Sequence, residues 1–600
     1  MKASSVPLPN NAVAAMAYYS QKKKKLWARR LTILKSSVWF CILLGWDSLT
    51  GRLLQNQQRR AKMLVQKLIE MGPTFIKVGQ FLSCRPDIIP PIYVEELANL
   101  QDKLPPFPNE QAYQVIFEEL GCPYDQIYAE LIPEPVAAAS LGQVYKGKLL
   151  TGEIVAVKVQ RPGIIDSIAL DLYLLRQLAG WAQKNISFVH SDLVALSDEF
   201  ATRLFAEMDY IEEGLNAEKF ARLYADLDYV RVPRIYLLYT NRRVLTMEWI
   251  DGVKITSTEV IRAQGLEPSD FLTVGFKFSL RQLLQGGFFH ADPHPGNLLV
   301  TPDGKIAYLD FGMISEVPPE TCDLLIISLL HMIAGDFAAL AQDYVLLGFL
   351  PPETDLTPLI PKLAEIFGNI REASVAEFGF KQSFEKLLAL IYEYSWNTPR
   401  LYLLIFRAFA TLEGIALKVN PNFQAYKVGY PYVAQWLLTK RSPILWDALK
   451  NFCLNNKTIQ WELVSDLLEN IYQSDDFHLN ETLGRLLEFL YSPQGNSLRY
   501  VLVDEVATNL ESLSQETFEE MMVLTRAINT PFAPITRLIA RLQNIQQFLD
   551  TKLLVNPLNF TSFLELSKLL FRPEAQRLGQ EVVSELGKRM LMRFINTPSP

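Results

Sequence analysis

Cysteine is scarce in this 600-residue sequence, and its cysteines lie far apart. No Cys-x-x-Cys pair occurs, and the five thiols are spread along the chain, at Cys41, Cys84, Cys122, Cys322 and Cys453. An odd number of dispersed cysteines argues against a disulfide framework and against a zinc site built from cysteine pairs. We therefore expect reduced thiols in a protein that is not secreted.

Long hydrophobic runs are also missing. No run of eighteen apolar residues occurs, which argues against an ordinary transmembrane helix. The nearest candidate is the uncharged stretch SSVWFCILLGW (36–46), which follows the basic stretch QKKKKLWARR (21–30). It starts late and lacks a small-residue cleavage pattern, so it fits a signal peptide poorly. Two interpretations stay open: an anchor at a membrane surface, or a helix docked on the protein with a solvated basic end.

Acidic residues are almost absent from the first sixty positions. That segment holds eleven Lys or Arg residues and one acid, Asp47, although the whole chain has a net charge of −7. The basic charge therefore belongs to one end of the chain. This pattern favours a local anionic partner such as a membrane surface, and it argues against a nucleic-acid groove running through the fold.

The order of the predicted elements indicates an α+β protein. Helices are predicted for 61–102, for 192–215 and for most of the chain after Asp310, and strands for 143–163, 230–252 and the hairpin around Asp303-Gly304. The hairpin within 143–163 is expected to turn at Thr151-Gly152-Glu153. Because helices and strands do not alternate, we expect a two-lobed α+β body with helical extensions.

One stretch, HADPHPGNLLVTPDGKIAYLDFG (290–312), has the pattern of a metal-binding hairpin. Asp292 and Asn297 are five residues apart, and Asp310 follows across the predicted turn. Protein-kinase-like enzymes use this arrangement: the first Asp faces the acceptor hydroxyl, while the Asn and the second Asp hold magnesium beside the phosphates. Two prolines between Asp292 and Asn297 fix backbone φ angles, which helps to hold the oxygen ligands in place.

Other parts of a kinase-like site occur upstream in the expected order. Val-Ala-Val-Lys ends on Lys158, in a strand from which its ammonium could reach the α- and β-phosphates. Glu207 lies on the predicted long helix and is suited to pair with that lysine. Glu248 and Trp249 follow a strand and could form the hinge whose backbone binds adenine. Coincidental spacing is the alternative, and the number of matching parts argues against it.

The same loop allows a second interpretation. His290, Asp292 and His294 alternate along it and could together hold a transition metal. That interpretation leaves the spacing of Asn297 and Asp310 unexplained. We therefore expect His290 to pack or to form a hydrogen bond that orients the loop.

Three further features depart from ordinary protein kinases. The segment PVAAASLGQVY (135–145) stands in place of a glycine-rich phosphate loop, Lys-x-Gly-Gln occurs at 77–80, and Glu-x-Asp occurs at 207–209. Alanine resists positive φ, so the first segment cannot copy the backbone of a glycine loop. With these features, and with RAFATLEGIALKVNPNF (407–423), the chain resembles the UbiB-type atypical kinase family, the "activity of bc-one complex" kinases.

The resemblance implies a protein-kinase-like two-lobed fold with an N-terminal helical subdomain over the active site and a helical C-terminal extension. The organisation expected is a basic, amphipathic segment that is a candidate for membrane contact (1–60), a helical extension with the Lys-x-Gly-Gln motif (61–130), an N-lobe with an inserted long helix (131–250), a C-lobe (251–430) and a helical C-terminal extension (431–600). No motif suggests a role for the last segment.

The resemblance also implies cofactors and site residues. Members bind ATP or ADP with Mg²⁺, and the implied catalytic and metal-binding set is Lys158, Glu207, Asp292, Asn297 and Asp310. The implied nucleotide-contacting loop is Ala137, Ala138, Ala139 and Ser140. The implied regulatory residues are Lys77 and Gln80 on the added helix, and Asp209.

Within this set we expect two ion pairs. Glu207 and Asp209 are two residues apart and would face different sides of a regular helix. Our hypothesis is that Glu207 pairs with Lys158 and that Asp209 reaches Lys77. The alternative leaves Lys77 and Asp209 as solvated surface charges.

The residue before the first catalytic Asp also departs from the usual pattern. Ala291 stands where kinases controlled by loop phosphorylation carry Arg, and no Ala-Pro-Glu follows Asp310. With no guanidinium predicted beside Asp292, activation by loop phosphorylation is not expected.

These features lead to one main interpretation of function. We expect a Mg-ATP-dependent atypical kinase or ATPase that serves isoprenoid quinone metabolism (ubiquinone, plastoquinone or tocopherol-type prenyl lipids). The expected partners are ATP, membrane lipids, quinone precursors and quinone-biosynthesis proteins, with no nucleic acid. The expected location is a membrane surface facing the cytosol or inside an organelle. The alternatives are a nucleotide-sensing, pseudokinase-like module and a conventional serine/threonine kinase.

Overall fold

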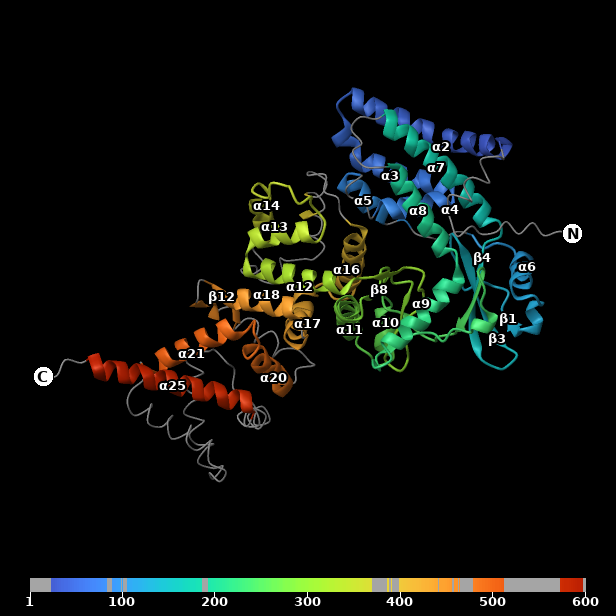
Figure 1. Cartoon of the computed structure of the whole chain (residues 1–600). Helices are drawn as coiled ribbons and strands as arrows, with labels where there is room; N and C mark the ends of the chain where they lie inside the picture. Colours follow the sequence, from blue (N-terminus) through green and yellow to red (C-terminus); the bar gives the residue numbers. More distant parts are fainter. Residues whose placement is uncertain are drawn as a thin grey trace. The chain divides into compact units, whose positions relative to one another are not determined.

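The computed structural model describes residues 23–83, 89–98, 100, 105–185, 193–368, 386–387, 390, 399–440, 442–455, 458–461, 463–464, 479–511 and 572–596. The chain divides into two compact units (Figure 1). The first comprises the described residues of Met1–Val317, Gly348–Pro351 and Gly379–Phe423, and the second those of Pro318–Leu347, Pro352–Phe378 and Gln424–Pro600.

Four helices open the first unit: α2 (Lys23–Leu49), α3 (Leu53–Met71), α4 (Pro73–Leu82) and α5 (Pro91–Ala98). Gly72, with a φ of 100°, separates α3 from α4. Pro73 occupies the first position of α4, where a backbone N–H would have no partner within the helix, so proline loses no hydrogen bond there. The three later helices share a buried core of Leu68, Met71, Phe75, Leu97 and Leu100.

Two ion pairs attach α2 to the rest of the first unit. Asp47, which is buried, accepts a hydrogen bond of 2.6 Å from Arg60 of α3. Arg29 donates to both carboxylate oxygens of Asp171 in α7 (Ile164–Asn185), at 2.6 and 2.8 Å. The stretch SSVWFCILLGW therefore lies within a helix that is docked on the protein.

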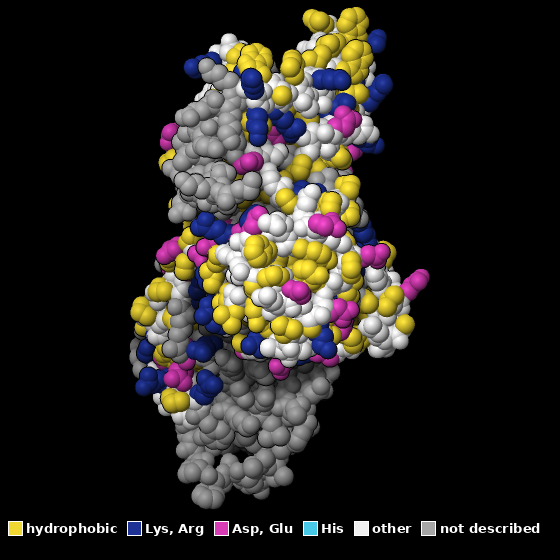
Figure 2. Space-filling view, turned by 90° about the vertical axis from the view of Figure 1, so that its right-hand side faces the viewer, with side chains coloured by type: hydrophobic (Ala, Val, Ile, Leu, Met, Phe, Trp, Pro, Cys, Tyr) yellow, Lys and Arg dark blue, Asp and Glu magenta, His cyan; other side chains and the backbone are white. Residues whose placement is uncertain are grey.

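The outer side of α2 is nevertheless apolar and exposed. Large side chains recur there every three or four residues and are each at least 41% exposed, namely Trp27, Leu31, Leu34, Val38, Ile42, Trp46 and Leu49. Figure 2 shows apolar side chains next to Lys and Arg at the top of the view, the level at which α2 lies in Figure 1. In the part of the chain that is described, no helix has both the length and the hydropathy needed to cross a bilayer.

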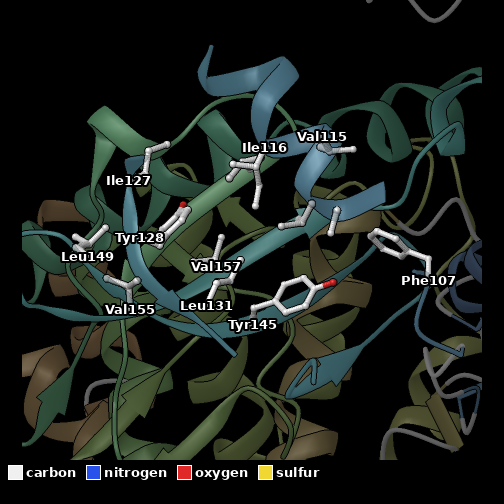
Figure 3. Close-up of a cluster of buried hydrophobic side chains, with 13 residues drawn as sticks. Phe107, Val115, Ile116, Ile127, Tyr128, Leu131, Tyr145, Leu149, Val155 and Val157 are labelled. Carbon is white, nitrogen blue, oxygen red and sulfur yellow. The ribbon is translucent and has the colours of Figure 1, made fainter. Parts of the chain in front are cut away.

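An antiparallel sheet of five strands follows. Its members are β1 (Tyr128–Leu131), β2 (Ala137–Ala138), β3 (Gly142–Leu149), β4 (Ile154–Gln160) and β6 (Val244–Glu248), in the order β1-β3-β4-β6, with β2 paired to β3. The turn predicted at Thr151-Gly152-Glu153 is confirmed, and Gly152 adopts a φ of 105° there. Helix α6 (Asn109–Leu120) covers one face of the sheet (Figure 3). The core between them includes Val115, Ile116, Tyr128, Tyr145 and Val157.

Three helices lie between β4 and β6 in the sequence: α7, α8 (Leu193–Glu207) and α9 (Tyr210–Leu223). The prediction of one continuous helix over 192–215 is wrong, because Asp209 leaves the helical conformation (φ −97°, ψ 98°). Its side chain accepts a 3.1 Å hydrogen bond from the N–H of Ile211 and so begins α9 as an N-cap. The break gives Glu207 and Glu213 independent orientations.

Short strands and helices complete the first unit. The strands β5 (Val230–Arg231), β7 (Val253–Lys254), β9 (Leu298–Val300) and β10 (Ile306–Tyr308) form a sheet in the order β5-β10-β9-β7, and β8 (Phe288–His290) pairs with β11 (Ile314–Glu316). The helices are α10 (Thr258–Ala263), α11 (Pro268–Arg281) and α16 (Arg400–Val419). The hairpin predicted at Asp303-Gly304 is confirmed by the pairing of β9 with β10.

Among its described residues, the second unit is helical apart from one short strand pair. Its helices are α12 (Pro319–Ala334), α13 (Phe337–Leu346), α14 (Leu359–Phe367), α17 (Ala425–Thr439), α18 (Pro443–Cys453), α20 (Leu479–Leu490), α21 (Asn496–Glu511) and α25 (Pro573–Asn596), and its strands are β12 (Leu454–Asn455) and β13 (Thr458–Ile459). Buried Asp323 joins α12 to the start of α18 by accepting hydrogen bonds from Lys440 and Ser442. The α+β class predicted for the chain is confirmed, while residues 512–571 of the expected C-terminal extension lie outside the described residues.

Candidate active site

Lys158 stands at the centre of the candidate site. It lies in β4, the strand that β3 and β6 flank. Its Nζ is 2.8 Å from each carboxylate oxygen of Glu213 and 3.1 Å from Oδ2 of Asp310. The ring of Tyr210 lies 4.9 Å from the same ammonium. The structure thus brings together Lys158 and Asp310, two predicted site residues that are distant in sequence.

The expected partner of Lys158 was wrong. Glu213 of α9 pairs with Lys158, whereas Glu207 pairs with Lys77 of α4. The reason is the break at Asp209. Since α8 ends at Glu207 and α9 starts afresh, the carboxylate that reaches the sheet comes from the first turn of α9.

Burial and the mutual attraction of these groups shift their pKa values in different directions. Burial lowers the pKa of Lys158, but Asp310 and Glu213 outweigh that effect and hold its pKa well above the ordinary value. Removal of water raises the pKa of Asp310, but the charge of Lys158 prevails and lowers it to about 2. Burial raises the pKa of Glu213 to about 7, although Lys158 opposes the rise. Asp310 is therefore fully ionised at neutral pH, and its side chain is 38% exposed.

The β9–β10 hairpin places Asn297 and Asp310 at the same end. Leu298 pairs with Tyr308, and the N–H of Leu309 donates to the carbonyl of Asn297 at 3.0 Å. Asp310 follows directly, and its Oδ1 accepts a 2.9 Å hydrogen bond from the N–H of Gly312. The register of one short hairpin therefore makes these two predicted residues neighbours.

The loop that carries Asp292 is held by His290. The Nε2 of His290 lies 2.6 Å from the carbonyl of Asp310, and its Nδ1 lies 3.3 Å from the N–H of Asp292. Burial lowers the pKa of His290, so the ring is neutral at pH 7 and can donate at one nitrogen and accept at the other. This confirms the expectation that His290 orients the loop.

The transition-metal interpretation of the same loop is not supported. Both ring nitrogens of His290 face backbone groups, and Nδ1 of His294 accepts from the N–H of Gly296. Across the residues that the structure describes, no group of three or more His, Cys, Asp or Glu side chains could hold a metal.

A magnesium ion fits the donors around Asp310 better. The Nδ2 of Asn297 faces the carbonyl of Asp292 at 3.5 Å, which turns its amide oxygen away from that carbonyl. An ionised carboxylate and an amide oxygen are the hard ligands that magnesium prefers, with phosphate oxygens and water completing the shell. Asn297 and Asp310 are thus chemically suited to a magnesium ion that a nucleotide shares.

The absence of a guanidinium beside Asp292 was predicted wrongly. Arg407 of α16 lies there, with Nη2 3.2 Å from the carbonyl of Ala291 and 3.9 Å from Oδ1 of Asp292. Sequence reasoning considered only the adjacent position, where Ala291 stands. The guanidinium instead comes from a helix more than one hundred residues further along the chain.

The alanine-rich segment forms a tight turn beside β3. Ala137 and Ala138 pair with β3, and the N–H of Ala139 donates to the carbonyl of Gly142 at 2.8 Å. The guanidinium of Arg161 donates to the carbonyl of Ala139 at 3.3 Å. Ser140 is fully buried. The role of this segment in contacting nucleotide stays a prediction.

The expected adenine hinge lies at the end of β6. The N–H of Glu248 donates to the carbonyl of Arg234 at 2.8 Å, and that of Trp249 donates to the carbonyl of Ile154 at 3.0 Å. The carboxylate of Glu248 binds Arg231. Both N–H groups are thus engaged within the protein, so the prediction that this segment binds adenine rests on its position in the sheet next to β4.

The helix with the Lys-x-Gly-Gln motif reaches the candidate site through Lys77. This lysine pairs with Glu207, and a Cβ placed on Gly312 would lie 3.9 Å from Cγ of Glu207. Gln80 instead faces the carbonyl of Leu100 at 3.5 Å. The expected contact of Asp209 with Lys77 was wrong, because Asp209 caps α9 and lies 3.7 Å from Arg242.

Sequence reasoning missed Glu213, Tyr210 and Arg407. A usable pattern existed for the first two, because Asp209 followed by Glu212 has the spacing of a helix start. Recognising it would have divided the long helix and directed attention to the first turn of the second part. No local pattern links Arg407 to Asp292.

Comparison with known proteins agrees with the geometry. Residues 99–344 match the ABC1 atypical kinase-like domain, and residues 496–598 match the C-terminal domain of ABC1 kinase 3. An uncharacterized Synechocystis protein, sll0005, is 43% identical over 97% of this chain and 88% of its own length. The Arabidopsis thaliana chloroplastic protein "activity of bc1 complex kinase 3" is 41% identical over 97% of this chain and 84% of its own length.

Proposed function

Because the chain belongs to the ABC1 atypical kinase family, we propose that it is a Mg-ATP-dependent atypical kinase or ATPase that serves isoprenoid quinone or related prenyl-lipid metabolism at a membrane surface. The observation that carries the nucleotide part of this proposal is the contact of Lys158 with Asp310. Next to that contact, the β9–β10 hairpin presents Asn297.

Each of these residues has a role in the proposal. Lys158 binds the α- and β-phosphates of the nucleotide, and Glu213 holds its ammonium in position. Asp310 and Asn297 hold the magnesium ion, which when bound supplies positive charge to the phosphate oxygens. Asp292 accepts the proton of the attacking hydroxyl or water, from a loop that His290 orients.

The membrane part of the proposal rests on α2. Trp27, Trp39 and Trp46 are all exposed on this helix, and basic residues are concentrated in its first two turns. A helix that is apolar on its outer side as well as toward the core requires a second apolar partner. Lysine and arginine beside exposed tryptophans match the chemistry of an anionic lipid interface.

The proposed location is supported by the names of relatives and by this surface. Several relatives are named as chloroplastic proteins, among them "activity of bc1 complex kinase" 1 and 3 of Arabidopsis thaliana. We propose that this chain works at a membrane or lipid surface of the kind where prenyl lipids are made, facing the cytosol or the interior of an organelle. Quinone precursors and quinone-biosynthesis proteins are the proposed partners.

Two other functions are less well supported. A pseudokinase-like nucleotide sensor need not keep Lys158, Asp292, Asn297 and Asp310 together, and all four are present. A conventional serine/threonine kinase carries an Ala-Pro-Glu motif after its Asp-Phe-Gly, and none follows Asp310.

The proposal is tested by measuring phosphate release from ATP with magnesium, with and without anionic liposomes that carry a quinone-precursor mimic. We expect turnover that the liposomes stimulate and that Asp310→Asn lowers by about 1000-fold, because the amide lacks the negative charge with which the Asp310 carboxylate neutralises magnesium. The matched control is Asp303→Asn, which removes an exposed carboxylate from the turn of the same hairpin.

Three outcomes separate the candidate functions. Turnover that depends on Asp310 and on liposomes supports the proposal. Nucleotide binding without turnover identifies a sensor instead. Phosphate transfer to serine or threonine of an added protein, at a rate the liposomes do not change, identifies a conventional kinase.

A further inference from the structure

The helix α16 contributes one cationic side chain to the candidate site, and the proposed function leaves that side chain without a role. Arg407 lies in the third turn of α16, and its side chain is 24% exposed. It belongs to the segment RAFATLEGIALKVNPNF, which the sequence analysis singled out without assigning it a function.

The contacts of Arg407 span the two loops that carry the acidic residues. On one side, Nη2 donates to the carbonyl of Ala291 at 3.2 Å and lies 3.9 Å from Oδ1 of Asp292. On the other side, the same nitrogen lies 3.6 Å from the sulfur of Met313, three residues after Asp310. One guanidinium thus touches both loops.

These two loops also touch each other at the same place. The N–H of Ala291 donates to the carbonyl of Met313 at 2.9 Å, where β8 pairs with β11. This strand pair has three residues on each side, so few backbone hydrogen bonds hold it together. A charged hydrogen bond to the carbonyl of Ala291 therefore adds a substantial part of the local stability.

The helix that carries Arg407 is firmly placed. The ring of Phe409 lies 5.2 Å from that of Phe276 in α11 and 6.2 Å from that of Phe289 in β8. Ala408 is buried, and α16 packs along α11. The guanidinium is therefore presented from a rigid element, as a positioning group requires.

We propose that Arg407 is a positioning residue that holds the loop of Asp292 against the segment after Asp310, and that its charge sets where the Asp292 carboxylate stands for the reaction. This inference rests on the proposed phosphoryl-transfer function and adds to it a residue from outside the kinase motifs. Ala291 stands at the adjacent position, so the guanidinium beside Asp292 comes from α16 and not from the loop itself.

The proposed role requires arginine in particular. A planar guanidinium can donate to a carbonyl and face a carboxylate at the same time. A lysine at position 407 has a shorter side chain, so its ammonium would lie farther from the carbonyl of Ala291 and from Asp292 than Nη2 of Arg407 does. The proposed function assigns nucleotide binding to Lys158 and magnesium, so nucleotide affinity and the positioning role of Arg407 can be measured separately.

The test uses the full chain with Arg407→Ala and Arg407→Lys, and with Lys418→Ala as the matched control. Lys418 is an exposed cation in the last turn of the same helix. We expect Arg407→Ala to lower kcat on the order of 100-fold while the affinity for Mg-ATP stays close to that of the parent protein. The kcat of Arg407→Lys should fall between those of Arg407→Ala and the parent protein. The kcat of Lys418→Ala should equal that of the parent protein.

Chemical rescue distinguishes positioning from a general loss of structure. Ethylguanidinium added to Arg407→Ala should restore part of kcat, because it can occupy the space of the deleted group, whereas ethylammonium should restore less. Hydrogen exchange gives a second measurement that needs no turnover. The amide of Ala291 should exchange faster in Arg407→Ala, and that of Leu245 in β6 should not change.

Each outcome supports or overturns the inference. The inference is overturned if Arg407→Ala has the same kcat as Lys418→Ala. It is also overturned if Arg407→Ala loses nucleotide affinity and turnover together and ethylguanidinium restores neither. If the parent protein has no turnover, the proposed function fails. Exchange at Ala291 then decides the positioning role separately, with unchanged exchange counting against it.

Discussion

Two lysine–glutamate pairs meet near the Asp-Phe-Gly turn, and they are built differently. Lys158 and Glu213 come from the five-stranded sheet and from α9, and the Glu213 side chain is 4% exposed. Lys77 and Glu207 join the added helix α4 to the end of α8, and the Glu207 side chain is 25% exposed. The first pair shares its lysine with Asp310.

The difference indicates what each pair does. Removal of one member of a buried pair leaves an uncompensated charge, which costs far more than the pair contributes while intact. A partly exposed pair can be screened and replaced by water. We therefore expect the first pair to be required for the site itself, and the second to govern how firmly α4 is held beside it.

Among the changes that test this comparison, the largest effect is expected when the pair of Lys158 and Glu213 is broken. Glu213→Gln should lower turnover on the order of 100-fold, because Lys158 loses the carboxylate that holds its ammonium in place. Steady-state kinetics with ATP would measure this. Glu212→Gln is the matched control, since Glu212 is the exposed neighbour in the same helical turn. If Glu207→Gln lowers turnover more than Glu213→Gln does, Glu207 is the functional partner of Lys158, as the sequence predicted.

A second change extends the comparison to the ion pair of Arg29 and Asp171, which joins α2 to α7. Arg29→Met leaves the carboxylate of Asp171, which is fully buried, without its two hydrogen bonds from Arg29. We expect a loss of about 2 kcal/mol in the free energy of unfolding. Denaturant titration of the purified chain would measure it. Arg30→Met removes the adjacent exposed arginine and should have almost no effect.

The smallest expected effect concerns the second pair. A double-mutant cycle on Lys77 and Glu207 should give a coupling energy of about 1 kcal/mol, because both side chains are partly shielded but still reach water. Thermal unfolding of the two single mutants and the double mutant supplies the cycle. The same cycle on Lys77 and Asp209 should give no coupling. Coupling in that second cycle would contradict the pairing described above.

Much of the candidate site could be predicted because its residues are set by local geometry. Asn297 and Asp310 flank a hairpin, and the turn at Asp303-Gly304 determines which residues of its strands are opposite each other. His290 and Asp292 lie on one short loop, so their contact is also local. Lys158 could be placed on a strand from its alternating, β-branched neighbours.

The errors share a physical cause as well. Apolar spacing continues through Met208, so periodicity alone does not detect the helix break that an N-cap aspartate produces. Without that break, Glu207 and Glu213 could not be told apart as partners of Lys158. The alanine-rich segment and the hinge show the same limit, since their hydrogen bonds depend on strand pairing.

By itself, the sequence determined the hairpin that carries Asn297 and Asp310, the strand of Lys158 and the apolar, basic character of the first helix. Each depends on turn chemistry, alternation or composition over a few neighbouring residues. Tertiary structure alone decided that Glu213 pairs with Lys158, that Glu207 pairs with Lys77 and that Arg407 approaches Asp292. Those contacts join elements that are far apart in the chain, and they follow from how the helices pack, which no short stretch of sequence encodes.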